Sequence, residues 1–365
     1  MIYALLKKII ICSIMIPFQN KVSTVNSLRN LRHIKKISIV FMMLVLFGAC
    51  KNKHQEIDIS NIQIDQKFYR FDQDLFTIPQ DSIWDYVPVL EEKYGNYFDA
   101  YNNLVIRIGG TNQINYDEKL LHFLSDPYIE DSYKSAQQVF REVNFEKEIS
   151  EAFKRIKYIY PNKEIPDIYT HISGFNQSLI IDSAYMSISL DKYLGVDSKF
   201  YKMLRTPLYL TQNMHPKKIP SDVITAYLLT EFPNTIENPT LLDEMVYYGK
   251  IQYVLDVLMP ETNDTLKWGI SEQKLDWCSN NEQKMWLYLI EHKLLFTTNV
   301  SDVKRFIDEG PFTSVFSKEA PAKTGRWIGY QIVQSYMRHN SNISLPELME
   351  SYKHQAILNN SKYKP

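Results

Sequence analysis

Cysteine and glycine are both scarce in this chain of 365 residues, which has three cysteines and 11 glycines. Cys12, Cys50 and Cys278 lie far apart in the sequence, so a CxxC pair or a cysteine-based metal cluster is excluded. Cys278 is the single cysteine after residue 50, and one thiol cannot form an internal disulfide. We expect Cys278 to be buried as a small apolar side chain beside Trp277. The few glycines and the absence of a low-complexity linker argue against a mobile hinge between domains.

Several other signatures are missing. The chain after Cys50 has no run of 18 apolar residues, so we expect a soluble body that is tethered at one end. The GxSxG motif of serine nucleophiles, the phosphate-binding P-loop and the GxGxxG dinucleotide fingerprint are all absent. The sequence therefore gives no support to these three classes of enzyme.

Acidic residues are absent from the first 49 positions, which contain seven of the 41 lysines and arginines. Without this segment, 34 basic residues stand against 42 acidic ones, a net charge of −8. A negatively charged chain with no Lys/Arg-rich patch is repelled by a phosphate backbone, so we exclude nucleic-acid binding. The 316 residues from Cys50 onward are enough to bury a substantial core.

The segment before Cys50 has the order of an export signal. A basic run that ends at Lys36 is followed by an apolar run over 37–47, then by Gly48 and Ala49. This order, with cysteine directly after small residues, is typical of a bacterial lipobox, in which Cys50 carries the lipid and becomes the mature N-terminus. A short buried or membrane-spanning helix is the competing interpretation, but the apolar run is too short to cross ~30 Å of hydrocarbon comfortably. We therefore predict an export signal over 1–49, with 1–28 explained by a start assigned too far upstream.

The periodicity of the remaining chain predicts a tether over 50–56 and a single α+β domain over 57–365. Apolar and polar residues alternate between 57 and 76, which indicates one or two strands. Three runs rich in β-formers follow in the stretch 166–195, at 168–172, 178–181 and 185–190. The helical patterns cover 81–94, 133–160, 218–232, 239–259, 271–298, 301–308, 325–339 and 345–358. A small antiparallel or mixed sheet followed by a mainly helical C-terminal half is the expected fold.

The most informative candidate for chemistry is the predicted helix that follows Thr240. Zinc peptidases of the HExxH type carry two histidines and a glutamate on a helix in this topological position. Here the five positions, Asp243 to Tyr247, keep the glutamate as Glu244 but replace the two histidines by Asp243 and Tyr247. Since neutral tyrosine is a poor zinc ligand, this helix is not expected to hold zinc.

A structural role explains the same residues. Thr240 and Asp243 have the spacing of a capping box, and acidic residues in a first turn complement the helix dipole. Gly249, inside this helix, costs about 1 kcal/mol relative to alanine, which predicts that a close neighbour crosses there.

Other candidate residues have equally plain structural interpretations. Glu282 could supply a third acidic ligand to a peptidase-like site, but it also suits the start of a helix. Only His292, next to Glu291 and on one helical face with Tyr288, has a second ligand-type residue at a telling spacing. We therefore predict no metal site and no cofactor. The chain has 25 tyrosines, 18 phenylalanines and five tryptophans. Clusters such as Tyr247 and Tyr248 are either core or a surface for a partner.

Five separated motifs stand out in the chain: RFD at 70–72 with the Leu-Phe pair at 75–76, SISLDKYLG at 187–195, LLDEMVYYGKIQYVLDVLMP at 241–260, EGPFT at 309–313 and WIGYQIVQSYM at 327–337. In this order, and with the final SKYKP at 361–365, they resemble the gliding-motility lipoprotein family GldB of the Bacteroidetes. The resemblance implies a membrane-anchored component needed for gliding over surfaces, which acts with the machinery that exports adhesins. The family is itself similar to predicted zinc peptidases whose metal motif is degenerate, as it is here.

The leading hypothesis is a non-enzymatic lipoprotein held by Cys50, with a peptidase-like body that contacts other cell-envelope proteins. Tethers of lipoproteins that reach the outer face of the outer membrane tend to be acidic; residues 51–55 are not, which suggests the periplasmic side. The alternative is a metal-dependent hydrolase with an atypical site that uses Glu244, Asp243 and Glu282. A sugar- or peptidoglycan-binding module is a third possibility, which rests on the aromatic content.

Overall fold

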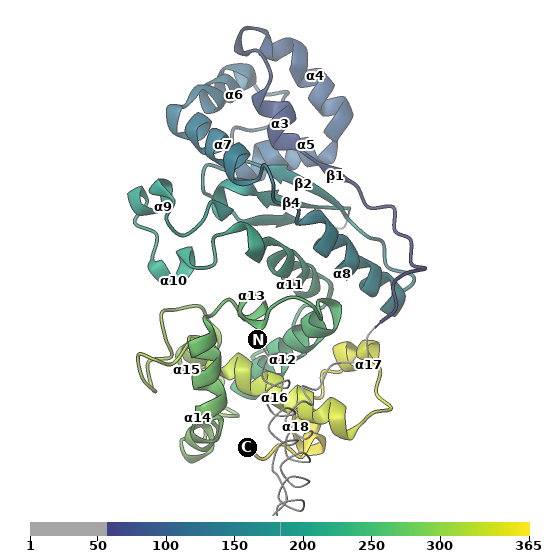
Figure 1. The fold of residues 1–365 in the computed structure, drawn as a ribbon, viewed down its shortest axis with the longest axis vertical. Helices are drawn as coiled ribbons and strands as arrows, with labels where there is room; N and C mark the ends of the chain where they lie inside the picture. Colours follow the sequence, from purple (N-terminus) through teal and green to yellow (C-terminus); the bar gives the residue numbers. More distant parts are fainter. Residues whose placement is uncertain (1–56, 183) are drawn as a thin grey trace, which may run out of the picture. The chain divides into compact units, whose positions relative to one another are not determined.

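A computed structural model describes residues 57–182 and 184–365, which belong to a compact unit spanning 54–365. The predicted export signal, Cys50 and the tether therefore lie outside the described residues. Figure 1 shows the order of the elements, with a small sheet between N-terminal and C-terminal helices. None of the described helices is long and apolar enough to cross a membrane.

The sheet has four strands in the order β1-β2-β4-β3. They are β1 (Phe68–Tyr69), β2 (Asp167–His171), β3 (Leu179–Ile181) and β4 (Tyr185–Ser189). β1 and β4 both pair with β2 in parallel, whereas β3 pairs with β4 in antiparallel orientation. The prediction of a small mixed sheet followed by a mainly helical half is confirmed, and its three strands over 166–195 fall where the β-rich runs indicated.

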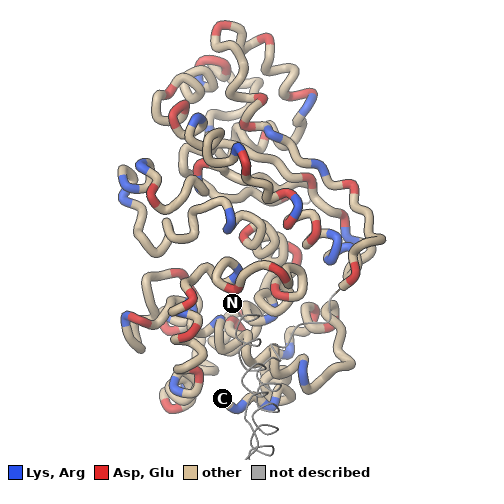
Figure 2. Tube along the Cα trace, in the orientation of Figure 1, with Lys and Arg blue, Asp and Glu red and all other residues tan. Residues whose placement is uncertain are grey.

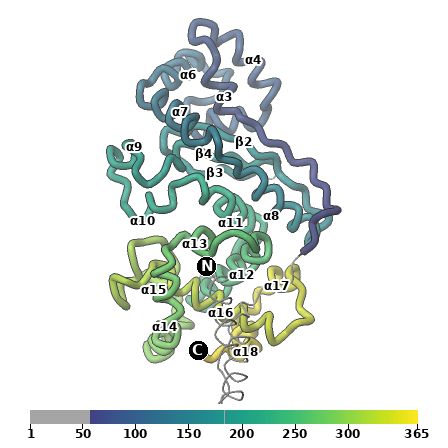
Figure 3. The backbone as a smooth tube through the Cα atoms, in the orientation of Figure 1, coloured from purple at the N-terminus to yellow at the C-terminus, as the bar shows by residue number. Residues whose placement is uncertain are grey.

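Successive side chains of a strand point to opposite faces, and the two faces of this sheet pack against different cores. Tyr185 and Ile180 pack against an aromatic core, together with Phe71, Tyr97 and Tyr101. This core is formed by helices that precede β2: α3 (Phe71–Phe76), α4 (Ile83–Tyr94), α5 (Asn96–Ala100), the π-helix η2 (Tyr101–Val105) and α6 (Tyr116–Ser125). Figure 3 shows α3, α4 and α6 together at one end of the fold. The short helix η1 (Gln80–Ser82) precedes α4, and α7 (Pro127–Val139) follows α6 and packs its buried Ala136 in the second core.

The opposite face of the sheet packs against α8 (Glu146–Ile159) and α11 (Ile219–Glu231). Ile168, Met186 and Ile188 are fully buried in this second core. Short elements connect β4 to α11: η3 (Leu190–Tyr193), α9 (Lys199–Met203), α10 (Leu208–Thr211) and η4 (Pro216–Lys218).

α12 (Leu241–Leu258) is the central helix of the C-terminal half, and it is buried over most of its length. A helix that is apolar on all sides is normally enclosed by others, as α12 is. The helices that follow it are α13 (Asp264–Trp268), α14 (Glu272–Glu291), α15 (Val300–Ile307), α16 (Thr324–His339), α17 (Leu345–Glu350) and α18 (His354–Ser361). Cys278 is buried in the core that they share with α12, as predicted.

The prediction of one or two strands over 57–76 is confirmed only at 68–69 and is wrong for the rest of the stretch. Only β1 pairs with the sheet, and 71–76 form α3. Ile57 and Ile64 pack against two different cores without strand pairing, so burial of alternate residues produces the pattern. Arg70 is the N-cap residue of α3, and its carbonyl oxygen accepts hydrogen bonds from the backbone N–H groups of Gln73 and Asp74.

The single helix predicted over 133–160 is two helices, α7 and α8, with a break at 140–145. Phe140 and Phe145 turn inward and pack edge to face in the core. The side chain of Asn144 accepts a hydrogen bond from the backbone N–H of Lys147, which offers the chain a local alternative to a continuous helix.

Two of the predicted helices at the C-terminal end were also too long. α14 ends at Glu291 rather than at 298, because Lys293 adopts a left-handed conformation with φ of 54°. The helix predicted over 345–358 is divided into α17 and α18. The buried ammonium group of Lys250 donates to the carbonyl oxygens of Met349 and Ser351, 3.3 and 2.8 Å away, which holds the chain between the two helices.

Candidate functional site

The first turn of α12 contains the positions that a zinc peptidase would use, and Asp243 is fully engaged there. The Thr240 side chain accepts from the Asp243 backbone N–H, and the Thr240 N–H donates to Asp243 Oδ2 over 2.9 Å, so the predicted capping box is present. Asp243 Oδ1 lies 3.2 Å from His354 Nδ1. Burial lowers the pKa of His354 to about 4, so the imidazole is neutral near pH 7 and donates to the carboxylate.

Glu244 lies at the position compared above with the glutamate of the HExxH motif. Its Oε1 accepts a hydrogen bond from Asn234 Nδ2 over 3.0 Å. Burial raises the pKa of Glu244, while the Asn234 hydrogen bond and the charge of Arg326 act in the opposite direction. A raised carboxylate pKa is a property of general acids and bases, but desolvation alone produces it too.

Tyr247 occupies the second histidine position and lies in the core. Its ring packs against Tyr248 with centroids 5.1 Å apart at an angle of 65°. Burial raises the pKa of Tyr247 to about 12, so the phenol is neutral. Asp243 therefore caps the helix, and Tyr247 fills part of the core.

Glu282 lies in another environment, between α14 and the C-terminal segment. Its Oε1 accepts a hydrogen bond from the hydroxyl group of Tyr363 over 2.8 Å. In the described part of the chain, no three His, Cys, Asp or Glu side chains gather in a way that could hold a metal ion. The three carboxylates of the hydrolase alternative, Glu244, Asp243 and Glu282, are thus not brought together as a cluster.

A serine–histidine pair lies in the middle of the sheet. His171 Nδ1 is 2.6 Å from Ser187 Oγ, which is 2.7 Å from the Tyr97 hydroxyl group. All three side chains are fully or almost fully buried, and burial lowers the pKa of His171 to about 3. A buried histidine that stays neutral beside the aromatic core suits a structural hydrogen-bond network.

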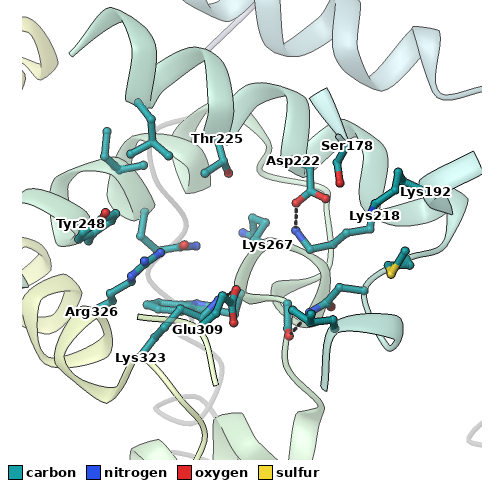
Figure 4. Close-up of a pocket in the computed structure, with 18 of the residues that line it drawn as sticks. Ser178, Lys192, Lys218, Asp222, Thr225, Tyr248, Lys267, Glu309, Lys323 and Arg326 are labelled. Atoms are coloured by element: carbon teal, nitrogen blue, oxygen red, sulfur yellow. Dashed lines mark hydrogen bonds and ion pairs between the residues drawn. The ribbon is translucent and has the colours of Figure 1, made fainter. Parts of the chain in front are cut away.

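A cavity lined by several charged side chains lies beside α12 and has a volume of about 370 Å³. Figure 4 shows side chains from several elements around it. The charged ones are Lys192 from η3, Lys218 and Asp222 from the start of α11, Lys267 from α13, Glu309 from the loop after α15, and Lys323 and Arg326 from the start of α16. We call it the basic cavity.

Both carboxylates of the basic cavity are held by neighbours. Asp222 forms an ion pair with Lys218 and accepts from the Tyr193 hydroxyl group over 3.0 Å. Glu309 lies 2.5 Å from the Lys323 ammonium group. Lys267 is paired with Asp256 at 2.8 Å, a residue outside the cavity lining.

Arg326 contacts a carbonyl oxygen and an aromatic ring rather than a carboxylate. Its Nε donates to the carbonyl oxygen of Ile307 over 2.7 Å, and its guanidinium lies 3.8 Å from the centre of the Tyr248 ring. Such cation–π contacts add roughly 0.5–2 kcal/mol. The two terminal amino groups of Arg326 have no hydrogen-bond partner among the described residues, and Arg326 is part of the cavity lining.

Sequence reasoning missed the basic cavity because its cations are dispersed over 192–326, with no run of basic residues. The motifs that resemble the GldB family could have indicated the cavity. Lys192 belongs to the motif at 187–195, Tyr248 to that at 241–260 and Glu309 to that at 309–313, while Arg326 directly precedes the one at 327–337. Residues from three separated motifs, and Arg326 next to a fourth, thus line one cavity.

The family model described as gliding motility protein GldB matches residues 52–365 of the chain. Neither the curated proteins nor the solved structures gave a match to the chain. Because the family model covers nearly all of the chain after residue 50, the chain belongs to the GldB family of gliding-motility lipoproteins.

Proposed function

We propose that this protein is a membrane-anchored, non-catalytic component of the cell-envelope machinery for gliding motility and adhesin export. The observation that carries the proposal is the family match, which begins at residue 52, two positions after Cys50. In this proposal, lipid on Cys50 holds the body at the membrane. One acyl chain binds membranes only marginally, so stable anchoring needs the two or three chains of a processed lipoprotein.

The contacts of α12 support the non-catalytic part of the proposal. Asp243 serves the capping box and His354, and Tyr247 packs in the core, so the positions of the lost histidines now stabilise the fold. The tether over 51–55 contains basic and uncharged residues but no acidic ones, which supports a location on the periplasmic side of the envelope.

Contacts with other envelope proteins need an accessible surface, and α14 offers one. Leu287 and Ile290, one turn apart, are 47% and 45% exposed, and Phe296 in the loop that follows is 58% exposed. Exposed apolar residues that cluster in this way are common at protein–protein contacts.

The anchoring is tested with Cys50→Ser, a change that removes the lipid acceptor but leaves the described body intact. We expect the protein to leave the membrane fraction or to remain unprocessed, while wild-type protein stays with the membrane and incorporates radiolabelled palmitate. Wild-type protein that never takes up palmitate would contradict the proposal.

The surface is tested by a photo-crosslinking amino acid at Leu287 in intact cells, with the same residue at exposed Tyr128 on α7 as the matched control. We expect Leu287 to capture a discrete envelope protein and Tyr128 to capture none. Equal capture at both positions would argue against a specific surface on α14.

The alternative function is a metal-dependent hydrolase that uses Glu244, and the raised pKa of that residue is the observation in its favour. Metal analysis of the purified full-length protein separates the two functions. Stoichiometric zinc in the native protein would favour the hydrolase, whereas the non-catalytic proposal expects none.

A further inference from the structure

We infer that the basic cavity binds a small organic phosphate, with the phosphate group at Lys218, Lys323 and Arg326 and the organic part against Trp268. This inference goes beyond the proposed function and does not depend on lipid at Cys50.

Charge is the first argument. Five cations and two carboxylates line the basic cavity, and Lys267 is also ion-paired with Asp256 and Asp264 outside the lining, so cations outnumber the carboxylates around the cavity by five to four. The chain from Cys50 onward has the opposite sign, −8, and Figure 2 shows acidic and basic residues interspersed along the described trace. A cavity wall whose charge is opposite to that of the whole molecule attracts anions.

The second argument is that cations are held close to one another. Lys323 and Arg326 both come from the start of α16, and Lys218 comes from η4 on the other side of the cavity. Burial lowers the pKa of Lys323, and the charges of Arg326 and Lys218 lower it further, against the opposing effect of Glu309. Gathering like charges costs free energy that an anion between them offsets.

The third argument concerns the N-terminus of α16, a helix of 16 residues. The helices α12, α14 and α17 begin with a threonine or serine cap and have an acidic residue in the first turn. α16 has no side-chain cap and no acidic residue there; it presents Lys323 and Arg326 instead. Cations are unfavourable at the positive end of a helix dipole, whereas a bound anion is favourable.

Size and lining define the ligand more closely. A volume of about 370 Å³ is within the range of small-molecule sites, roughly 300–1,000 Å³. The fork of Arg326, with its planar set of N–H donors, matches the several oxygens of a phosphate group better than the two of a carboxylate. Trp268 and Leu210 give apolar surface for the organic part. Gln252 Nε2, which is buried without a partner, can donate to a polar atom of the ligand.

The test is calorimetric titration of the full-length protein in neutral detergent. Phenyl phosphate is the main probe, with inorganic phosphate, benzoate and short-chain dihexanoyl phosphatidic acid as the other ligands. We expect saturable binding of phenyl phosphate that is tighter than that of benzoate or inorganic phosphate. Tighter binding of the phosphatidic acid would support the same phosphate site and identify a lipid as its source.

Arg326→Gln is the decisive variant, and Arg338→Gln at the exposed end of the same helix is its matched control. Loss of charged hydrogen bonds predicts affinity weaker by roughly tenfold to a hundredfold for Arg326→Gln and an unchanged affinity for Arg338→Gln. If Arg326→Gln does not fold, Lys323→Gln takes its place, since Lys323 is assigned to the same phosphate group, and the same loss of affinity is expected.

Three outcomes would overturn the inference. They are the absence of saturable binding by any of the phosphates, tighter binding of benzoate than of phenyl phosphate, and equal affinity in Arg326→Gln and Arg338→Gln. The readout is binding alone, so it is independent of the membrane and motility tests of the proposed function.

Discussion

Gly249 of α12 and Gly329 of α16 meet backbone to backbone, as the isolated glycine in a predicted helix led us to expect. A Cβ atom on Gly249 would lie 2.4 Å from the carbonyl carbon of Gly329. A Cβ atom on Gly329 would lie 1.7 Å from the carbonyl oxygen of Met245. The crossing also brings together two residues of the basic cavity, because Tyr248 is adjacent to Gly249 and Arg326 lies one turn before Gly329. The close approach of the two helices places the guanidinium over the ring.

We therefore predict that Gly249→Ala destabilises the protein by about 1–3 kcal/mol or more, as overpacking against rigid backbone does. Urea unfolding followed by circular dichroism measures the effect. Gly310→Ala is the control, because the nearest atoms to its Cβ would be 3.9 Å away, and we expect a change within about 0.5 kcal/mol. Similar losses in the two variants would show that the crossing is not tight.

Stability should fall in mild acid because of buried His354. Its pKa is about 4 in the folded protein and 6.5 in the unfolded chain, so the unfolded chain binds the proton first as the pH falls. The unfolding free energy is thus fully retained above pH 6.5 and decreases down to about pH 4, by roughly 3 kcal/mol for this group.

The check is the difference in unfolding free energy between pH 7 and pH 4.5, compared in wild type, His354→Asn and His122→Asn. We expect His354→Asn to reduce this difference and His122→Asn, at an exposed position of α6, to leave it as in wild type. His171, whose pKa of about 3 is lower still, adds to the wild-type loss in the same direction. A pH dependence unchanged in His354→Asn would contradict the assignment.

Thiol counting tests both the burial of Cys278 and the processing at Cys50. Burial raises the pKa of Cys278 to about 12, so its thiol should react slowly with a thiol reagent at pH 8 in the native protein. In denaturant, we expect one reactive thiol per mature molecule, because the acylated Cys50 has none. Two reactive thiols would show that Cys50 is not modified, and fast labelling without denaturant would show that Cys278 is accessible.

The elements predicted correctly from the sequence are those whose pattern reflects local physics. Three features depend on residues that are close in the chain: the capping box of Thr240 and Asp243, the helix that contains Gly249, and the three strands over 166–195. The errors occurred where a distant contact decides. Lys250 holds the carbonyl oxygens of Met349 and Ser351 and so divides a helix that local periodicity alone would continue.

The candidate site shows the same limit of prediction from local sequence patterns. The degenerate motif at Asp243, Glu244 and Tyr247 is visible in the sequence because a motif is defined by local spacing. The basic cavity is not visible, because Lys192 and Arg326 approach it from η3 and α16, which are more than 100 residues apart. Only the packing of α11, α12 and α16 brings those cations together.

The most direct test of the central claim compares Glu244→Gln with Cys50→Ser in cells that lack the wild-type protein, with gliding speed as the measurement. If the protein is a non-catalytic lipoprotein, cells with folded Glu244→Gln protein glide at the wild-type speed, and cells with Cys50→Ser do not glide. Loss of gliding in Glu244→Gln with normal folding and abundance, or normal gliding with an exported but unlipidated Cys50→Ser protein, would contradict the account.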